Sequence, residues 1–80
     1  MAVKTIKIEK PEDLALIILN QRKKSKLSRN KLALIAGVGR TAIFDIEHGK
    51  TTYQIDTLIK ILSVLNLNLC IEGIIWGDLD

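Results

Sequence analysis

A glycine-flanked joint between two short segments constrains the fold of this chain more than any other feature. Residues 29–36 (RNKLALIA) and 40–47 (RTAIFDIE) are each long enough for about two helical turns. Three residues separate them, and the first is Gly37, a residue type that readily takes the left-handed conformation in which helices end. We therefore expect a sharp reversal at Gly37, with Val38 inserted into the core beneath the turn.

Small and capping residues fit two helices that cross at this joint. Ala33 is small enough to let the helices approach closely, and Ser28 is a preferred residue type just before a helix. Gly39 stands where a Ser or Thr cap would start the second helix, a replacement of small cost. Gly49 is expected to end it. Together these residues predict a helix-turn-helix over residues 28–47.

Two longer helices are predicted on either side of this pair. Residues 11–24 begin with a proline and carry two acidic residues in the first turn, both of which suit a helix start. Apolar residues cover more than half of its circumference, which indicates burial by its own domain or also by a second chain. Residues 55–65 form the last helix, and its predicted buried stripe consists of Ile55, Leu58, Ile59, Leu62 and Leu65.

The segment LNLCIE, residues 67–72, alternates strictly between apolar and other residues and predicts a β-strand. Leu67, Leu69 and Ile71 would share one face. Because the edge groups of one short strand need partners, the strand must pair with another. The partner is either the N-terminal segment VKTIKI, residues 3–8, or the same strand of a second chain.

Positive charge is concentrated ahead of an acidic end. The net charge is +3, and the basic block comprises Arg22, Lys23, Lys24, Lys26, Arg29 and Lys31. Beyond Lys60 the charged residues are Glu72, Asp78 and Asp80. This pattern suggests one surface for a polyanion and another for a different partner, although a solvated basic helix end would give the same block.

Composition excludes several classes of function. One cysteine allows neither a disulfide framework nor a thiolate-rich metal site, and one histidine with no paired carboxylates forms no catalytic constellation. We therefore expect no enzyme activity, no cofactor and no metal. The sequence has no apolar run of 18 residues and no visible signal peptide, so we expect a cytoplasmic protein without a membrane partner.

The second helix of the pair has the size of an element that enters the major groove of DNA, about 12 Å wide. The alternative is an ordinary helical hairpin that binds nothing. The stretch LSRNKLALIAGVGRTAIFDIEHGK resembles the helix-turn-helix of the Xre/Cro repressor family in residue type and spacing. Within that family, KIEKPEDLALIILNQR and TLIKILSVLNLNLCIE are most similar to HipB antitoxins, which partner HipA-type kinases.

The resemblance implies a single domain over residues 1–80 and an all-α fold. The expected architecture is a lambda-repressor-like domain of four to five helices. A short β-strand at a dimer interface would come from residues 67–72 and, in an alternative arrangement, also from the N-terminal segment. The resemblance to HipB favours a sheet across a two-fold axis, with Leu67, Leu69 and Ile71 in the interface. A two-fold dimer in turn implies an inverted-repeat operator.

The resemblance also assigns roles to residues of the motif. The residues expected to contact bases are Arg40, Thr41, Phe44 and Asp45. The residues expected to contact phosphates come partly from the basic block and partly from the motif, and they are Arg22, Lys23, Lys24, Lys26, Arg29, Lys50, Thr51 and Thr52. Glu47 is expected to be structural, because it would pair with Arg22 and orient that side chain toward a phosphate. Gly37 is the other structural residue.

Some residues of the outer face allow two interpretations. Phe44 could contact a thymine methyl group, or it could belong to the core of a helix rotated from the expected orientation. Asp45 could accept a hydrogen bond from cytosine N4 or simply neutralise the face. Outside that face, in the apolar tail after the predicted strand, Trp76 could anchor a partner or cover the dimer core.

The helix-turn-helix pattern and the resemblance to HipB antitoxins together imply a homodimeric, sequence-specific repressor that is the antitoxin and autoregulator of a HipA-type toxin–antitoxin operon. Its partners would be an inverted-repeat operator in double-stranded DNA and a HipA-type serine/threonine kinase. Two alternatives stay open. One is a stand-alone repressor of the Xre family, and the other is a protein-interaction module that has lost base-specific reading.

Overall fold

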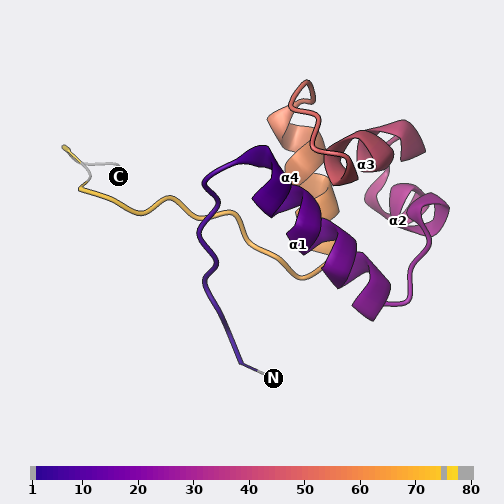
Figure 1. Ribbon diagram of the computed structural model, residues 1–80, viewed down its shortest axis with the longest axis horizontal. Helices are drawn as coiled ribbons and strands as arrows, with labels where there is room; N and C mark the ends of the chain where they lie inside the picture. The colour runs from indigo at the N-terminus through magenta and orange to yellow at the C-terminus, as the bar shows by residue number, and fades with distance from the viewer. Residues whose placement is uncertain (1, 75, 78–80) are drawn as a thin grey trace.

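The computed structural model describes residues 2–74, 76 and 77 as four helices flanked by two extended ends (Figure 1). The helices are α1 (Pro11–Lys24), α2 (Arg29–Ala36), α3 (Arg40–Glu47) and α4 (Ile55–Val64). These bounds confirm the predicted helices, and α4 ends one residue earlier than expected. None of the helices in this part of the chain is long and apolar enough to cross a membrane.

The starts of the helices follow from local side chains. Pro11 occupies the first turn of α1, and a carboxylate oxygen of Asp13 accepts hydrogen bonds from the backbone N–H groups of Glu9 and Lys10 at 3.0 and 3.2 Å. The Ser28 hydroxyl caps α2 by accepting from the backbone N–H of Lys31 at 3.0 Å. Gly39 precedes α3 in an extended conformation without a side-chain cap, as its lack of a side chain requires.

Each helix is followed by a residue in the left-handed conformation. At these four positions φ is between 58° and 80°, and the residues are Lys26, Gly37, Gly49 and Asn66. The next N–H group bonds back to a carbonyl five residues earlier, as from Leu27 to Arg22 at 3.1 Å and from Val38 to Ala33 at 3.0 Å. Glycine and asparagine tolerate this conformation, but lysine does so at a cost. The reversal predicted at Gly37 is confirmed.

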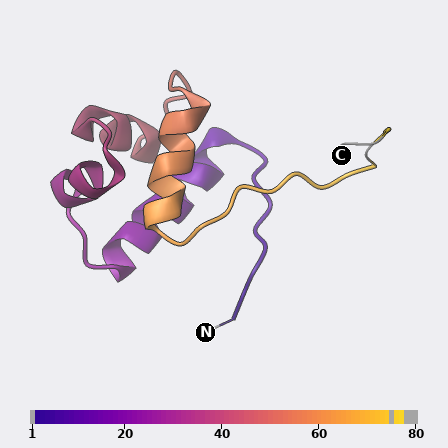
Figure 2. The same ribbon diagram turned by 180° about the vertical axis from the view of Figure 1, so that it is seen from behind.

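The core lies where the four helices meet. The helix pairs in contact include α1 with α3, α2 with α3, and α2 with α4. The buried cluster consists of Ile18, Leu32, Ala33, Ile43, Ile46, Leu58, Ile61, Leu62 and Leu65. Val38 and Tyr53 are half-buried against it. Figures 1 and 2 show α2 and α3 together at one end of the molecule, with both extended termini leaving on the opposite side.

The predicted buried stripe of α4 is partly wrong. Ile55 and Ile59 are 60% and 50% exposed, whereas Ile61 is fully buried. The face toward the core is formed by residues 58, 61, 62 and 65, which recur at helical spacing. Ile59 lies on the flank of that face and Ile55 in the first turn, so their apolar character did not indicate burial.

The predicted strands are not present in the single chain. Among the residues that the structure describes, neither 67–72 nor 3–8 belongs to a β-ladder, and both segments run as extended chain outside the helices (Figure 1). Leu67 is half-buried against the helical core, while Leu69 and Ile71 are 50% and 89% exposed. A strand needs a hydrogen-bonding partner, and within residues 2–74, 76 and 77 neither segment has one.

Candidate nucleic-acid interface

A buried carboxylate joins three helices behind the predicted DNA-binding face. The side chain of Glu47, the last residue of α3, is 1% exposed. Its Oε2 accepts a hydrogen bond from Nε of Arg22 on α1 at 2.7 Å, and its Oε1 accepts from the terminal NH2 of Arg22 at 3.1 Å. The same Oε1 accepts from Nε of Arg29 on α2 at 2.9 Å. The predicted pair of Arg22 and Glu47 is therefore confirmed, with Arg29 as an additional partner.

The two arginines differ in how far they reach the surface. Arg22 is only 8% exposed, and its remaining terminal nitrogen donates to the Leu27 carbonyl at 2.9 Å. The side chain of Arg29 is 40% exposed. Arg22 thus supports the interior of the site, and the geometry turns Arg29 toward solvent. Glu47 was expected to orient Arg22 toward a phosphate. Because Arg22 is buried, the arginine that Glu47 holds at the surface is Arg29 instead.

The environment of Glu47 keeps it ionised. Burial of the carboxyl group by itself raises its pKa, but the hydrogen bonds and charges of Arg22 and Arg29 outweigh burial and hold the pKa below its ordinary value. Two guanidinium groups and one carboxylate leave the cluster with one net positive charge. Because Arg22 and Glu47 are buried, that charge is presented to solvent by Arg29.

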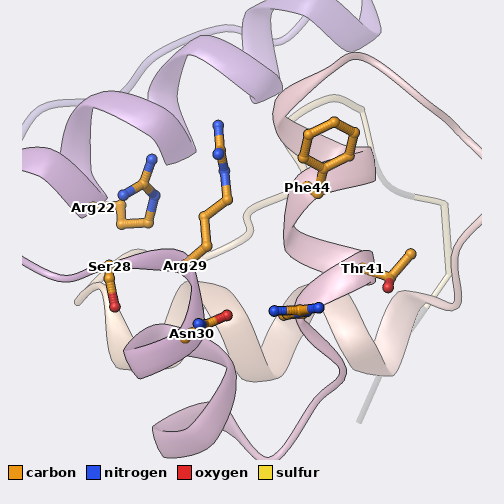
Figure 3. Close-up of a pocket in the computed structure, with 7 residues that line it drawn as sticks. Arg22, Ser28, Arg29, Asn30, Thr41 and Phe44 are labelled. Carbon is orange, nitrogen blue, oxygen red and sulfur yellow. The ribbon is translucent and has the colours of Figure 1, made fainter.

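An open hollow of about 560 Å³ lies between the first turns of α2 and α3 (Figure 3). Its lining consists of Arg22, Ser28, Arg29, Asn30, Arg40, Thr41 and Phe44. Arg40 and Thr41 are both exposed at the start of α3, where the predicted base contacts would begin. Asn30 did not stand out in the sequence analysis, and its only signal was its position in the first turn after the Ser28 cap.

Phe44 lies on the surface of α3 and is not part of the core. Phe44 is 47% exposed, so the interpretation in which a rotated helix buries it in the core is wrong. The ring stacks on that of His48 with centroids 3.9 Å apart, and His48 Nδ1 donates to the Phe44 carbonyl at 2.7 Å. The Arg29 guanidinium carbon lies 5.4 Å from the centroid of the Phe44 ring.

Asp45 pairs with a lysine in the turn after α3. Lys50 Nζ lies 3.5 Å from a carboxylate oxygen of Asp45, which is half-buried. An ion pair this open to solvent adds little stability, but it does neutralise the acidic group on this face. Lys50, Thr51 and Thr52 are all exposed in the turn after α3.

Other basic residues are exposed around the end of α1 and on α2. Lys23, Lys24 and Lys26 are exposed there, and Lys31 is exposed on α2. Lys26 belongs to the short turn between α1 and α2, three residues before Arg29. The predicted dimer residues Leu67, Leu69 and Ile71 belong to the C-terminal segment, which leaves the bundle on the side away from α2 and α3 (Figure 2).

Four packed helices with an exposed, glycine-bounded α3 beside a basic α2 define a helix-turn-helix domain of the kind found in transcription regulators. The sequence model of the helix-turn-helix family HTH_3, an Xre-like family, matches residues 18–71. The chain belongs to this family, which groups it with DNA-binding transcription regulators and not with enzymes.

Known proteins similar to the chain include regulators and DNA-bound complexes. An uncharacterized HTH-type transcriptional regulator of Sinorhizobium fredii, y4mF, is 35% identical over 63 residues, which are 79% of this chain and 83% of that protein. HipB in a HipA-HipB-O2-O3 complex superposes with a TM-score of 0.77 and 25% identity, covering 86% of this chain and 97% of that one. An HTH_3 regulator from Vibrio cholerae has a TM-score of 0.64 and 33% identity over 72% of this chain and 33% of its own.

Proposed function

We propose that this protein is a homodimeric repressor that reads an operator sequence with α3 in the major groove. The observation that carries the proposal is the exposed first turn of α3 at the hollow, next to the cationic Arg29. In this arrangement Arg40 and Thr41 reach base edges, and Arg40 matches the two acceptors of guanine. Phe44 and Asp45 lie farther along the same face and meet the next bases or the adjoining backbone.

The phosphate contacts of this proposal come from the basic surface around the hollow. Arg29 leads them, together with the exposed lysines near the end of α1 and the turn residues after α3, which are Lys23, Lys24, Lys26, Lys50, Thr51 and Thr52. Arg22 acts through Glu47 from inside the domain. Neutralising phosphates in this way supplies affinity without sequence preference.

Selection of bound duplexes from a random-sequence pool tests the proposal directly, because a repressor of this kind enriches an inverted repeat. On the enriched site we expect Arg40→Ala to cost about 1–3 kcal/mol, and on random DNA very little. Equal losses on both would reduce Arg40 to a phosphate contact. Failure to enrich any sequence would favour the module that has lost base reading, an alternative to which the exposed Phe44 and the Asp45–Lys50 pair lend some weight.

The dimer in this proposal forms through residues 67–72, which would pair with the same segment of a second chain. Its support is the strict alternation of the segment and the exposure of Leu69 and Ile71 in the single chain. Leu69→Pro removes a ladder donor and an apolar contact, so we expect a helical monomer in sedimentation and weak binding to the inverted repeat. A variant that stays dimeric at micromolar concentration would move the interface to α1 or to the apolar end around Trp76.

We also propose that the protein is the antitoxin and autoregulator of a HipA-type toxin. The support is the likeness to HipB along most of the chain, since 86% of it superposes on HipB of the HipA–HipB complex. The exposed Trp76 offers an anchor for such a partner. Co-expression with the protein encoded next to it should yield a stable complex in which a kinase is inhibited. A neighbouring kinase that neither co-purifies nor is inhibited would leave a stand-alone repressor.

A further inference from the structure

We propose that Phe44 positions Arg29 for a DNA phosphate and does not itself read a base. This inference rests on the proposed DNA-binding function. It attributes the affinity of the hollow for DNA to Arg29, whose side chain is held in place by its neighbours. Arg29 makes two contacts, one with the buried carboxylate of Glu47 and one with the exposed ring of Phe44.

The first contact fixes the inner edge of the guanidinium group. Nε of Arg29 donates to Oε1 of Glu47 at 2.9 Å, and that carboxylate is itself immobilised by two hydrogen bonds from Arg22. In the part of the chain that the structure describes, the terminal nitrogens of Arg29 have no hydrogen-bond partner. Their N–H groups therefore stay available on the side of the guanidinium away from Glu47.

The second contact places the Phe44 ring beside the same guanidinium group. The guanidinium carbon of Arg29 lies 5.4 Å from the centre of the Phe44 ring, within the range of a cation–π interaction. The Phe44 ring is in turn stacked on His48, whose Nδ1–H is tied to the Phe44 carbonyl at 2.7 Å. Figure 3 shows the Arg29 side chain rising from the start of α2 between Arg22 and Phe44.

The position of the Arg29 guanidinium suits a contact with a DNA phosphate and not with a base. Arg29 lies in the first turn of α2, whose free backbone N–H groups already favour an anion, and the hollow beside it also contains Arg40. The cluster carries one net positive charge with its exposed end at Arg29. A planar guanidinium with free terminal N–H groups can donate two parallel hydrogen bonds to one phosphate.

Four variants separate this role from the alternatives, with binding measured on a short duplex of mixed sequence over a range of salt concentrations. We expect R29A to weaken binding roughly tenfold, as for the loss of a charged hydrogen bond, and to lower the salt slope by about 0.9. R29K should lose nearly as much, because an ammonium cannot bond to Glu47 and phosphate in the same geometry. F44L should lose about two- to fivefold, whereas F44Y, which keeps the ring, should bind like the wild type.

Two further measurements decide how Phe44 acts. In the R29A background, F44L should have no additional effect, because the residue that it positions is gone. On the same duplex with uracil in place of thymine, the F44L loss should be unchanged, since no methyl group is being read. A loss that persists in the R29A background, or that disappears on uracil-containing DNA, would overturn the proposal.

The results of these binding experiments do not depend on whether the repressor proposal is correct. The mixed-sequence duplex does not require an operator, so these expectations hold even if selection enriches no site. Circular dichroism at each condition establishes that the variants are folded. Should F44L fail to fold, R29K decides the matter, and wild-type affinity in R29K would show that Arg29 acts only as a charge.

Discussion

Removal of the buried carboxylate at the end of α3 should destabilise the whole domain. Glu47 accepts three hydrogen bonds from two arginines on two other helices, so Glu47→Ala releases α1 and α2 from α3 together. It also leaves Arg22, which is 8% exposed, without a counter-charge. Breaking a buried pair from one side typically costs about 3–5 kcal/mol. At roughly 0.05–0.15 kcal/mol per residue, that is a large share of what a domain this small possesses.

Urea and thermal denaturation followed by circular dichroism would measure this loss. For a domain of this size the midpoint of thermal unfolding should fall by more than about 12 °C. Glu9→Ala is the matched control, because it removes a carboxylate whose side chain is 70% exposed and lies outside the helical bundle, so it should change little. A loss below about 1 kcal/mol in Glu47→Ala would show that the ion cluster does not hold the helices together.

The dependence of stability on pH gives an independent check of the same cluster. Because the arginines hold the pKa of Glu47 below its ordinary value of about 4.5, the ionised carboxylate stabilises the fold fully above that value. The contribution is lost as the pH falls through the lower pKa of the folded state. The stability difference between the wild type and Glu47→Gln should therefore shrink in acid. A difference that stays constant from neutral to strongly acidic pH would refute the assigned cause.

Two further predictions concern the exposed lysines. Lys23→Ala and Lys24→Ala should each lower the salt slope of DNA binding by about 0.9 if the residue contacts a phosphate, and unchanged slopes in titrations of both would make this part of the basic block a solvated helix end. Lys26→Gly should raise the free energy of unfolding by about 0.5–1 kcal/mol, because glycine adopts its φ of 58° without strain. Lys26→Ala, which keeps the strain and removes the charge, is the control in denaturation experiments.

The elements of this fold were predictable where their signals are local. A proline at the start of α1, a serine before α2 and glycines after α2 and α3 act within one turn of the chain, and all lie where the sequence analysis placed them. Which face of α4 is buried was less predictable. Apolar residues occur at positions 55, 58, 59, 61 and 62, so periodicity alone could not choose between two neighbouring stripes. Packing against α2 made that choice.

The contacts of the candidate site were harder to predict, because they join residues that are distant in the sequence. The pairing of Arg22 with Glu47 was expected only because the motif resembles a known family. The contact between Arg29 and Glu47 joins residues 18 positions apart, and nothing in the spacing indicated it. The direction of Phe44 depended on the rotation of α3 about its axis, which is fixed by burial of Ile43 and Ile46 in the core.

The C-terminal segment, residues 67–72, has the alternating pattern of a β-strand but forms no β-ladder with the other residues that the structure describes. Leu67 packs on the core directly after the left-handed Asn66, so the start of the segment is anchored to the bundle. If the segment stays extended, Leu69 and Ile71 project to the same side as Leu67. In the single chain these two residues are 50% and 89% exposed, an arrangement that leaves much of their apolar surface in water. Strict alternation in so short a stretch is typical of a half-buried strand, and a second copy offers the matching edge and the matching apolar face at once. A second copy of the segment is therefore the partner that we propose for it.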